Sequence, residues 1–174
     1  LVDFCLAQQH LVVELEQLCQ NLPLRVCHND TKINNMLYSE QQQRGIAAID
    51  LDTCMPGFWL FDFGDMVRTC CSPEPEDSLN TEAVKIRPEI FKALAEGYLT
   101  GLAGVITQAE QHSLLLGAKI MCLMIGIRFL ADHLNGDVYF AVKRDNHNLQ
   151  RAHNQIRLYQ DLLKQQDELA AYLS

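Results

Sequence analysis

Positive charge is scarce in this sequence, and its cysteines and histidines lack the spacing of metal ligands. There are 14 Lys and Arg against 22 Asp and Glu, giving a net charge of −8 and no basic patch that would suggest nucleic acid as a partner. None of the seven cysteines forms a C-x-x-C pair, and the six histidines are scattered, which argues against a zinc knuckle and a metal hydrolase. Scattered cysteines in odd number favour reduced thiols and a cytoplasmic location.

The sequence also lacks a signal peptide, an internal repeat and an uninterrupted membrane span. Its most apolar stretch, Leu114–Leu130, contains Lys119 and Arg128 and is therefore predicted to be a core helix, with no membrane as partner. What remains is a chain of 174 residues, 48% hydrophobic and 21% charged, which suits one folded domain over residues 1–174. The chain begins with Leu1 inside an amphipathic pattern, so we expect a fragment or a processed chain.

Hydrophobic periodicity predicts a mostly helical α+β fold. Short strands are expected at residues 24–27, 36–38 and 46–49, and the last two flank a glutamine-rich turn, which indicates a β-hairpin. Helices are expected at residues 2–20, 65–71, 88–103, 107–134 and 147–172. The polar loop at residues 28–34 lies between the first two strands, and we expect the chemistry where the loops meet.

Residues 28–35 carry the most informative pattern, His-Asn-Asp-Thr-Lys-Ile-Asn-Asn, which has the form H-x-D-x-K-x-x-N. A protein-kinase catalytic loop has a similar spacing, in which an Asp reaches the acceptor hydroxyl and an Asn faces a magnesium ion. We therefore expect Asp30 to be the catalytic base and Asn35 to be a metal ligand. Lys32 is expected to meet the transferred phosphate as a point charge, with an ordinary surface lysine as the alternative.

Asp50 follows Asn35 by fifteen residues, at the end of the apolar run 46–49. Because Mg²⁺ prefers oxygen ligands, we interpret Asp50 as the second metal ligand, with Asp52 as a weaker candidate on the same side of an extended strand. The triplet Asp62-Phe63-Gly64 has the letters of the protein-kinase metal motif but lies beyond a further turn. We therefore interpret Asp62 as a structural residue that anchors the loop or caps the following helix.

His28 could serve as a general base, but Asp30 is better placed for that role. We interpret His28 as a structural histidine that hydrogen-bonds the loop backbone and keeps the loop rigid.

With these motifs the sequence resembles the aminoglycoside phosphotransferase-like superfamily and, within it, the N-acetylhexosamine 1-kinases. The resemblance covers nearly the whole chain. It rests on residues 28–35, on Ile49–Thr53 with Met55–Gly57, on Phe61–Asp65, on Gly126–Leu130 with Asp132, and on Gly136–Phe140. It implies the C-terminal lobe of a protein-kinase-like fold, in which a small β-hairpin carries the catalytic and metal loops.

The resemblance implies ATP-dependent phosphorylation of the anomeric hydroxyl of N-acetylglucosamine or N-acetylgalactosamine, with Mg²⁺ as cofactor and ATP as co-substrate. Asp30 would act as base and touch the substrate, and Asn35 and Asp50 would hold the magnesium. Arg128 and Tyr139 match positions that resemble sugar-pocket residues of that family. From the residues alone, a salt bridge of Arg128 to Asp132 and core packing of Tyr139 are equally open.

One departure from the family is large. No glycine-rich loop, strand lysine or partner glutamate precedes the catalytic loop. We therefore expect the N-terminal ATP-binding lobe to be absent from this chain and the chain to be inactive without it.

Two other functions stay open. One is a kinase of the same fold that acts on choline, homoserine or an aminoglycoside, which the catalytic loop cannot distinguish from a sugar kinase. The other is a non-catalytic kinase-like interaction domain, against which the joint presence of Asp30, Asn35 and Asp50 argues.

Overall fold

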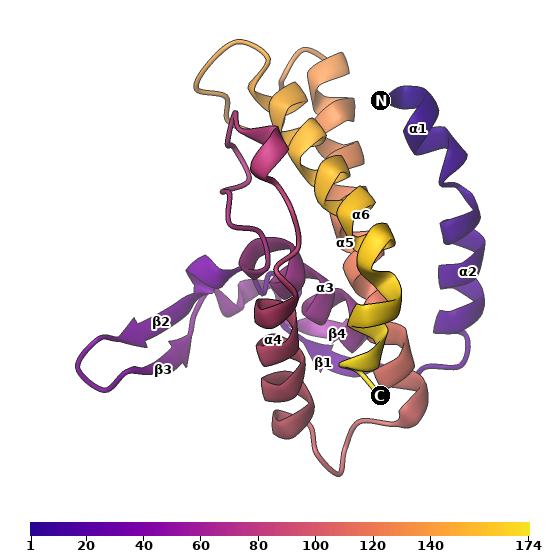
Figure 1. The fold of residues 1–174 in the computed structure, drawn as a ribbon, viewed down its shortest axis with the longest axis vertical. Coiled ribbons are helices and arrows are strands. Elements are labelled where there is room, and N and C mark those ends of the chain that lie inside the picture. Colours follow the sequence, from indigo (N-terminus) through magenta and orange to yellow (C-terminus); the bar gives the residue numbers. More distant parts are fainter.

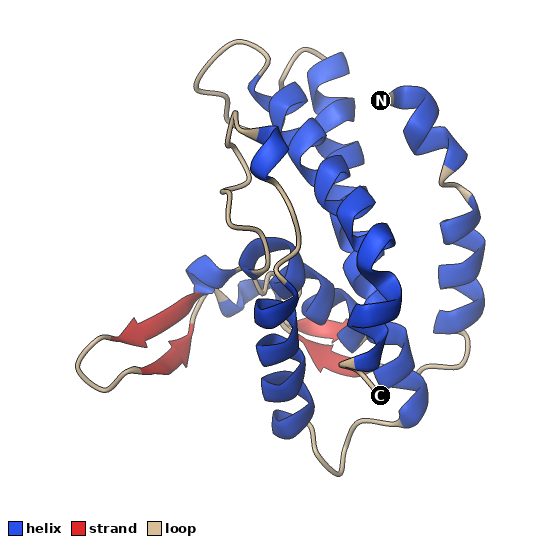
Figure 2. Ribbon diagram, in the orientation of Figure 1, coloured by secondary structure: helices blue, strands red, loops and turns tan.

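Helices make up most of the computed structural model, which describes residues 1–174. Figure 1 and Figure 2 show them arranged around a central helix, with one pair of strands extending away from the helices and the other pair beside their lower part. The α-helices are Val2–Ala7 (α1), His10–Cys19 (α2), Trp59–Cys70 (α3), Pro88–Gly101 (α4), Gln108–Leu134 (α5) and His147–Ala171 (α6). Single 3₁₀ turns occupy Ile33–Asn35 (η1), Leu51–Thr53 (η2) and Thr81–Ala83 (η3). The prediction of a mostly helical α+β fold is confirmed.

Two small antiparallel sheets hold the loops of interest. Strand β2 (Met36–Ser39) pairs with β3 (Arg44–Ala48), the two segments expected to form a hairpin, and this pair extends away from the helices in Figure 1. Strand β1 (Arg25–Cys27) pairs with β4 (Met55–Gly57), a strand that the sequence did not predict. Residues 28–35 therefore leave β1 and lead into β2, while residues 49–53 run from β3 back towards β4.

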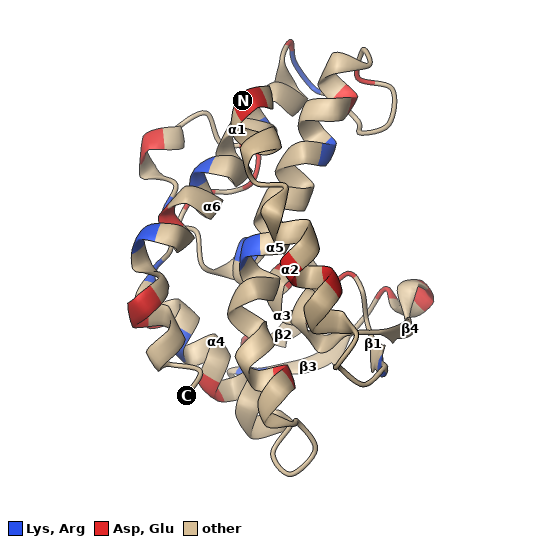
Figure 3. Ribbon diagram, turned by 90° about the vertical axis from the view of Figure 1, so that its right-hand side faces the viewer, with Lys and Arg blue, Asp and Glu red and all other residues tan.

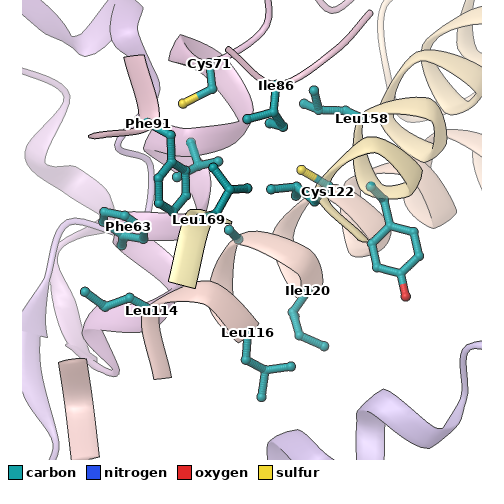
Figure 4. Packing of buried hydrophobic residues seen from close by; sticks show 14 of the residues in the cluster. Phe63, Cys71, Ile86, Phe91, Leu114, Leu116, Ile120, Cys122, Leu158 and Leu169 are labelled. Carbon is teal, nitrogen blue, oxygen red and sulfur yellow. The ribbon is translucent and has the colours of Figure 1, made fainter. Parts of the chain in front are cut away.

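The core lies where α5 packs against α3 and α6. Figure 4 shows Phe63 of α3, Phe91 of α4, Leu114 and Cys122 of α5 and Leu158 of α6 in one cluster, all of them fully buried. By length and composition α5 could cross a membrane, but 61% of its most apolar stretch is buried inside the protein. Such burial is typical of a core helix.

The crossing of α3 and α5 is unusually close because glycine occupies it on both helices. A Cβ at Gly64 would lie 2.3 Å from the carbonyl oxygen of Gly117, and one at Gly117 would lie 2.0 Å from the carbonyl oxygen of Leu60. No other residue type fits there without moving a backbone, so these two glycines fix where α3 sits on the core.

Strand β1 is tied to the start of α5 by a two-pronged ion pair. Arg25 donates from Nε and Nη2 to the two carboxylate oxygens of Glu110 at 2.7 and 2.9 Å. Glu110 also completes a capping box, since its carboxylate accepts from the backbone N–H of Thr107 and its own N–H donates to the Thr107 hydroxyl. The hydrogen bonds from Arg25 lower the pKa of Glu110, and the pair holds β1, which leads into the 28–35 loop, against α5.

The helix boundaries differ from expectation in two places. The helix expected over residues 2–20 is divided between α1 and α2, with a break at Gln8 and Gln9. Helix α3 begins at Trp59 instead of residue 65, because Leu60, Phe63 and Val67 fall on one buried helical face. Asp62 is therefore inside the first turn of α3, so the alternative that it caps a following helix was wrong.

Charged side chains of both signs are distributed along the helices and loops. In the view of Figure 3 no continuous basic stretch is present, in agreement with the acidic composition.

Candidate active site

The loop at residues 28–35 is fixed to α3 through Asp62. The backbone N–H groups of His28 and Asn29 donate to the two oxygens of this carboxylate, each at 2.8 Å, and the Thr31 hydroxyl donates to the Asp62 carbonyl at 2.6 Å. Burial raises the pKa of Asp62, while the two N–H donors act against that rise. Asp62 thus joins the loop to a helix of the core.

A second set of hydrogen bonds joins this loop to the segment that contains Asp50. His28 Nε2 donates to the Ile49 carbonyl at 2.9 Å, and the Thr53 hydroxyl donates to the His28 carbonyl at 2.7 Å. The Asn29 amide donates to the Thr53 carbonyl at 3.0 Å. Since these bonds lie on either side of Asp50, they fix its position relative to Asp30.

Three charged side chains converge between the two segments. Lys32 Nζ lies 2.6 Å from Asp30 Oδ2 and 3.9 Å from Asp50 Oδ2, so one ammonium group stands between two carboxylates. The hydrogen bond to Asp30 raises the pKa of Lys32 and keeps it charged. The side chains of Asp30 and Asp50 are 27% and 46% exposed, so both remain open to a ligand.

Asn35 completes this group of side chains. It is buried, and its Nδ2 donates to the Asp30 carbonyl at 2.9 Å and to Asp30 Oδ2 at 3.1 Å. The backbone carbonyl of Asn35 accepts from the N–H of Ile49 at 2.9 Å, a further link to the Asp50 segment. The structure therefore brings Asp30, Lys32, Asn35 and Asp50 together.

The residues fit a magnesium ion that shares its shell with phosphate. No cluster of three or more His, Cys, Asp or Glu side chains is present, so no site made of such residues alone exists. Asn35 Oδ1 takes part in no hydrogen bond, and the Asp50 carboxylate is nearly half exposed. One amide oxygen and one carboxylate, with phosphates and waters, form the kind of ligand set that Mg²⁺ adopts at phosphoryl-transfer sites.

Asp50 has an unusual backbone conformation, with φ 64° and ψ 53° in the left-handed region. Asp and Asn tolerate this region better than other non-glycine residues. Asn29, whose side chain contacts the Asp50 segment, has a similar φ of 63°. Both loops therefore turn sharply next to the converging side chains.

A polar pocket of about 330 Å³ adjoins Lys32. Its walls come from the η1 turn, the C-terminal end of α3, the loop at residues 72–76 and α6. Sequence reasoning did not identify this pocket, because its α6 residues are ordinary polar positions of an amphipathic helix.

Arg128 and Tyr139 lie in a different hollow. It is lined by these two residues together with Asp132 and Phe140, and neither Arg128 nor Tyr139 lines the pocket beside Lys32. The Arg128 guanidinium lies over the rings of Tyr139 and Phe140, at 5.6 and 5.3 Å from their centroids. The structure does not bring this pair together with Lys32.

The purely structural alternatives, a salt bridge of Arg128 to Asp132 and core packing of Tyr139, were wrong. Asp132 makes no salt bridge with Arg128, because its carboxylate accepts the backbone N–H groups of residues 138, 139 and 140 at 3.1, 2.8 and 2.9 Å. Tyr139 is 73% exposed and so is no core residue.

A comparison with protein families matches the part of the chain that contains the loop, Asp50 and α3. Residues 2–105 match the family described as "Phosphotransferase enzyme family". The matched span is more than half of the chain and includes Asp30, Lys32, Asn35, Asp50 and Asp62. The superfamily part of the resemblance is thereby confirmed, whereas the N-acetylhexosamine part stays a prediction. The chain belongs to the phosphotransferase enzyme family.

Proposed function

We propose that this chain carries the phosphoryl-transfer residues of an ATP-dependent kinase whose acceptor is the anomeric hydroxyl of an N-acetylhexosamine. The observation that supports the kinase chemistry is the placement of Lys32 between Asp30 and Asp50, with Asn35 bonded to Asp30. The sugar as acceptor rests on the resemblance described above. In the same proposal, residues 1–174 form the C-terminal catalytic lobe of a protein-kinase-like fold.

Asp30 orients the acceptor and takes its proton. Both the Lys32 ammonium and the Asn35 amide donate to Asp30 Oδ2, and Oδ1 makes no hydrogen bond. Oδ1 is therefore the oxygen that accepts the proton of the sugar hydroxyl as the hydroxyl oxygen attacks phosphorus. The two bonds to Oδ2 hold the carboxylate in a fixed orientation for this transfer.

Lys32 contributes to neutralising the phosphate charge directly, and Asn35 and Asp50 contribute through Mg²⁺. The Lys32 ammonium is close enough to both carboxylates to meet a γ-phosphoryl group that enters between them. Asn35 and Asp50 would hold Mg²⁺, which supplies neutralisation of the triphosphate charge when bound. Because phosphoryl transfer depends mainly on position and charge, these four residues are the part of the machinery that we assign to the chain, and the ATP-binding lobe would supply the rest.

The test is a kinase assay with Mg·ATP on the complete protein that contains these residues. The acceptors are N-acetylglucosamine, N-acetylgalactosamine, choline, homoserine and an aminoglycoside. We expect turnover of a hexosamine. We expect Asp30→Asn to lower kcat by about 10²- to 10⁴-fold with little change in the urea midpoint. Asp167→Asn is the matched control, since Asp167 is exposed on α6 and makes no hydrogen bond through its side chain, and it should keep native turnover.

Two results would count against the proposal in different ways. Near-native turnover in Asp30→Asn would remove the assignment of the base. Turnover of a cationic amine without turnover of any hexosamine would remove the sugar and leave a kinase of another substrate.

A further inference from the structure

The pocket beside Lys32 has the size of one sugar ring. Its volume of about 330 Å³ lies at the lower end of the range for small-molecule sites. Such a volume suits a single pyranose and is too small for a multi-ring aminoglycoside. Lys32 lines the pocket and contacts Asp30 at 2.6 Å, so the pocket adjoins the side chain that is paired with the proposed base.

The cationic groups of the pocket are already paired within the protein. Arg68 is buried, and its guanidinium donates to Asp65 at 2.8 Å and to Glu76. Lys32 is paired with Asp30. The remaining carboxylate, that of Glu74, accepts hydrogen bonds from Ser78 and Asn80. An anionic ligand therefore finds no unpaired cation here.

Aromatic side chains are absent from the pocket lining, which consists almost wholly of polar residues. Proteins that recognise quaternary ammonium groups usually surround them with aromatic rings. The lining therefore argues against choline and favours a ligand that makes many hydrogen bonds.

One polar atom in the pocket wall lacks a partner. Gln155 of α6 is only 1% exposed, and its Nε2 donates to the Asn154 side chain at 3.1 Å. Asn154 in turn donates to the Pro75 carbonyl at 3.0 Å, which fixes the pair. Gln155 Oε1 is buried and makes no hydrogen bond. Buried polar atoms in native proteins almost always have partners, so this oxygen needs a donor that the chain itself does not supply.

We propose that this pocket is the acceptor subsite, that its ligand is a neutral, hydroxyl-rich molecule of one ring, and that Gln155 determines specificity by accepting a hydrogen bond from it. An N-acetylhexosamine offers such donors in its hydroxyls and its amide N–H. The role as acceptor subsite rests on the proposed kinase function, whereas the chemical class of the ligand follows from the residues that line the pocket.

The experiment measures sugar binding without ATP. The ¹⁵N-labelled full chain is titrated with N-acetylglucosamine, and the side-chain NH₂ signals of Gln155 report on the pocket. We expect saturable shifts of these signals. We expect Gln155→Leu to weaken Kd by about three- to tenfold, the effect of one lost hydrogen bond. Gln166→Leu is the matched control, because Gln166 lies on the exposed face of the same helix and contacts only Lys119 there.

A second variant keeps the test valid if Gln155→Leu fails to fold. Ser72 is half-buried at the pocket wall, outside the core, so Ser72→Trp fills the pocket and should abolish sugar binding. Circular dichroism checks the fold of each variant.

Each other outcome overturns the subsite. It fails if the sugar binds and neither variant changes Kd, if the shifts map to Arg128 and Tyr139, if choline binds more tightly, or if no sugar binds. A chain that binds the sugar in this pocket while the complete protein shows no kinase turnover would contradict the proposed function and leave the subsite standing.

Discussion

Gly117→Ala is the substitution for which the structure gives the sharpest prediction of stability. Gly117 lies at the crossing of α5 with α3, where an added Cβ would be 2.0 Å from the Leu60 carbonyl oxygen and 2.7 Å from its carbonyl carbon. Both atoms belong to the backbone, so no rotamer change can relieve the contact. The two helices would have to separate across the most buried part of the core.

The size of the effect follows from two opposing contributions. Overpacking of a core costs about 1–3 kcal/mol, and a clash with backbone belongs at the upper end of that range. Alanine gains about 1 kcal/mol over glycine in helix propensity. We therefore expect Gly117→Ala to lower the free energy of unfolding by about 2 kcal/mol. For a domain of this size that corresponds to a fall in Tm of about 4–8 °C.

The assay is urea and thermal unfolding of the full chain, followed by circular dichroism at 222 nm. Gly97→Ala in α4 is the matched control, because nothing lies within 4 Å of its added Cβ. This control should gain up to about 1 kcal/mol, so the same substitution is expected to act in opposite directions at the two sites. If Gly117→Ala is as stable as the native chain, the close crossing of α3 and α5 is not as described.

Three further predictions concern the bonds that hold the site. Thr53→Val removes the hydrogen bond from the Thr53 hydroxyl to the His28 carbonyl and should raise the Mg²⁺ concentration for half-maximal turnover by about three- to tenfold. Thr53→Ser keeps the hydroxyl and should leave this concentration unchanged. Equal values for the two variants would refute the positioning role of Thr53. Asp62→Asn leaves one of two loop N–H groups unpaired and should lower the free energy of unfolding in urea by about 2 kcal/mol; a loss below about 0.5 kcal/mol would contradict this. The hydrogen bonds from Arg25 lower the pKa of Glu110 in the folded protein from its ordinary value of 4.5. Their contribution to the free energy of unfolding is therefore full above pH 4.5 and is lost as the pH falls through the lowered pKa of the folded state. In Glu110→Gln, the free energy of unfolding measured in urea should therefore fall less steeply below pH 4.5 than in the native chain. An unchanged fall would argue against the pairing of Glu110 with Arg25.

Local sequence pattern was sufficient for the long helices and for the group around Asp30. The starts of α4 at Pro88 and of α6 at His147 coincide with the predicted ones, since apolar periodicity and terminal Pro, Asn and Gly residues act locally. The short hairpin, which the sequence also indicated, returns the chain to the loop and leaves Lys32 between Asp30 and Asp50, whose roles stay predictions.

Long-range packing explains what the sequence did not reveal. The helix expected at residues 65–71 begins already at Trp59, because burial against α5 makes residues 59–64 the start of α3. Gln155 is one of many glutamines in a polar helix, and packing against parts of the chain distant in sequence, Gly126 of α5 among them, buries it. Nothing in the local sequence distinguishes it from its exposed neighbours. Likewise, Arg128 and Asp132 have ideal salt-bridge spacing, but three backbone N–H groups occupy the carboxylate instead.

A single series of contacts holds the site in place, from the core to its exposed edge. The glycine crossing fixes α3, Asp62 of α3 holds the start of the 28–35 loop, and His28 and Thr53 then hold the Asp50 segment. Each step towards Asp50 has less buried surface behind it, and residues 41–52 are all exposed. Changes near the core should therefore reduce mainly stability. Changes near Asp50 should reduce metal affinity and turnover while the fold is retained, because phosphoryl transfer is sensitive to small errors in position.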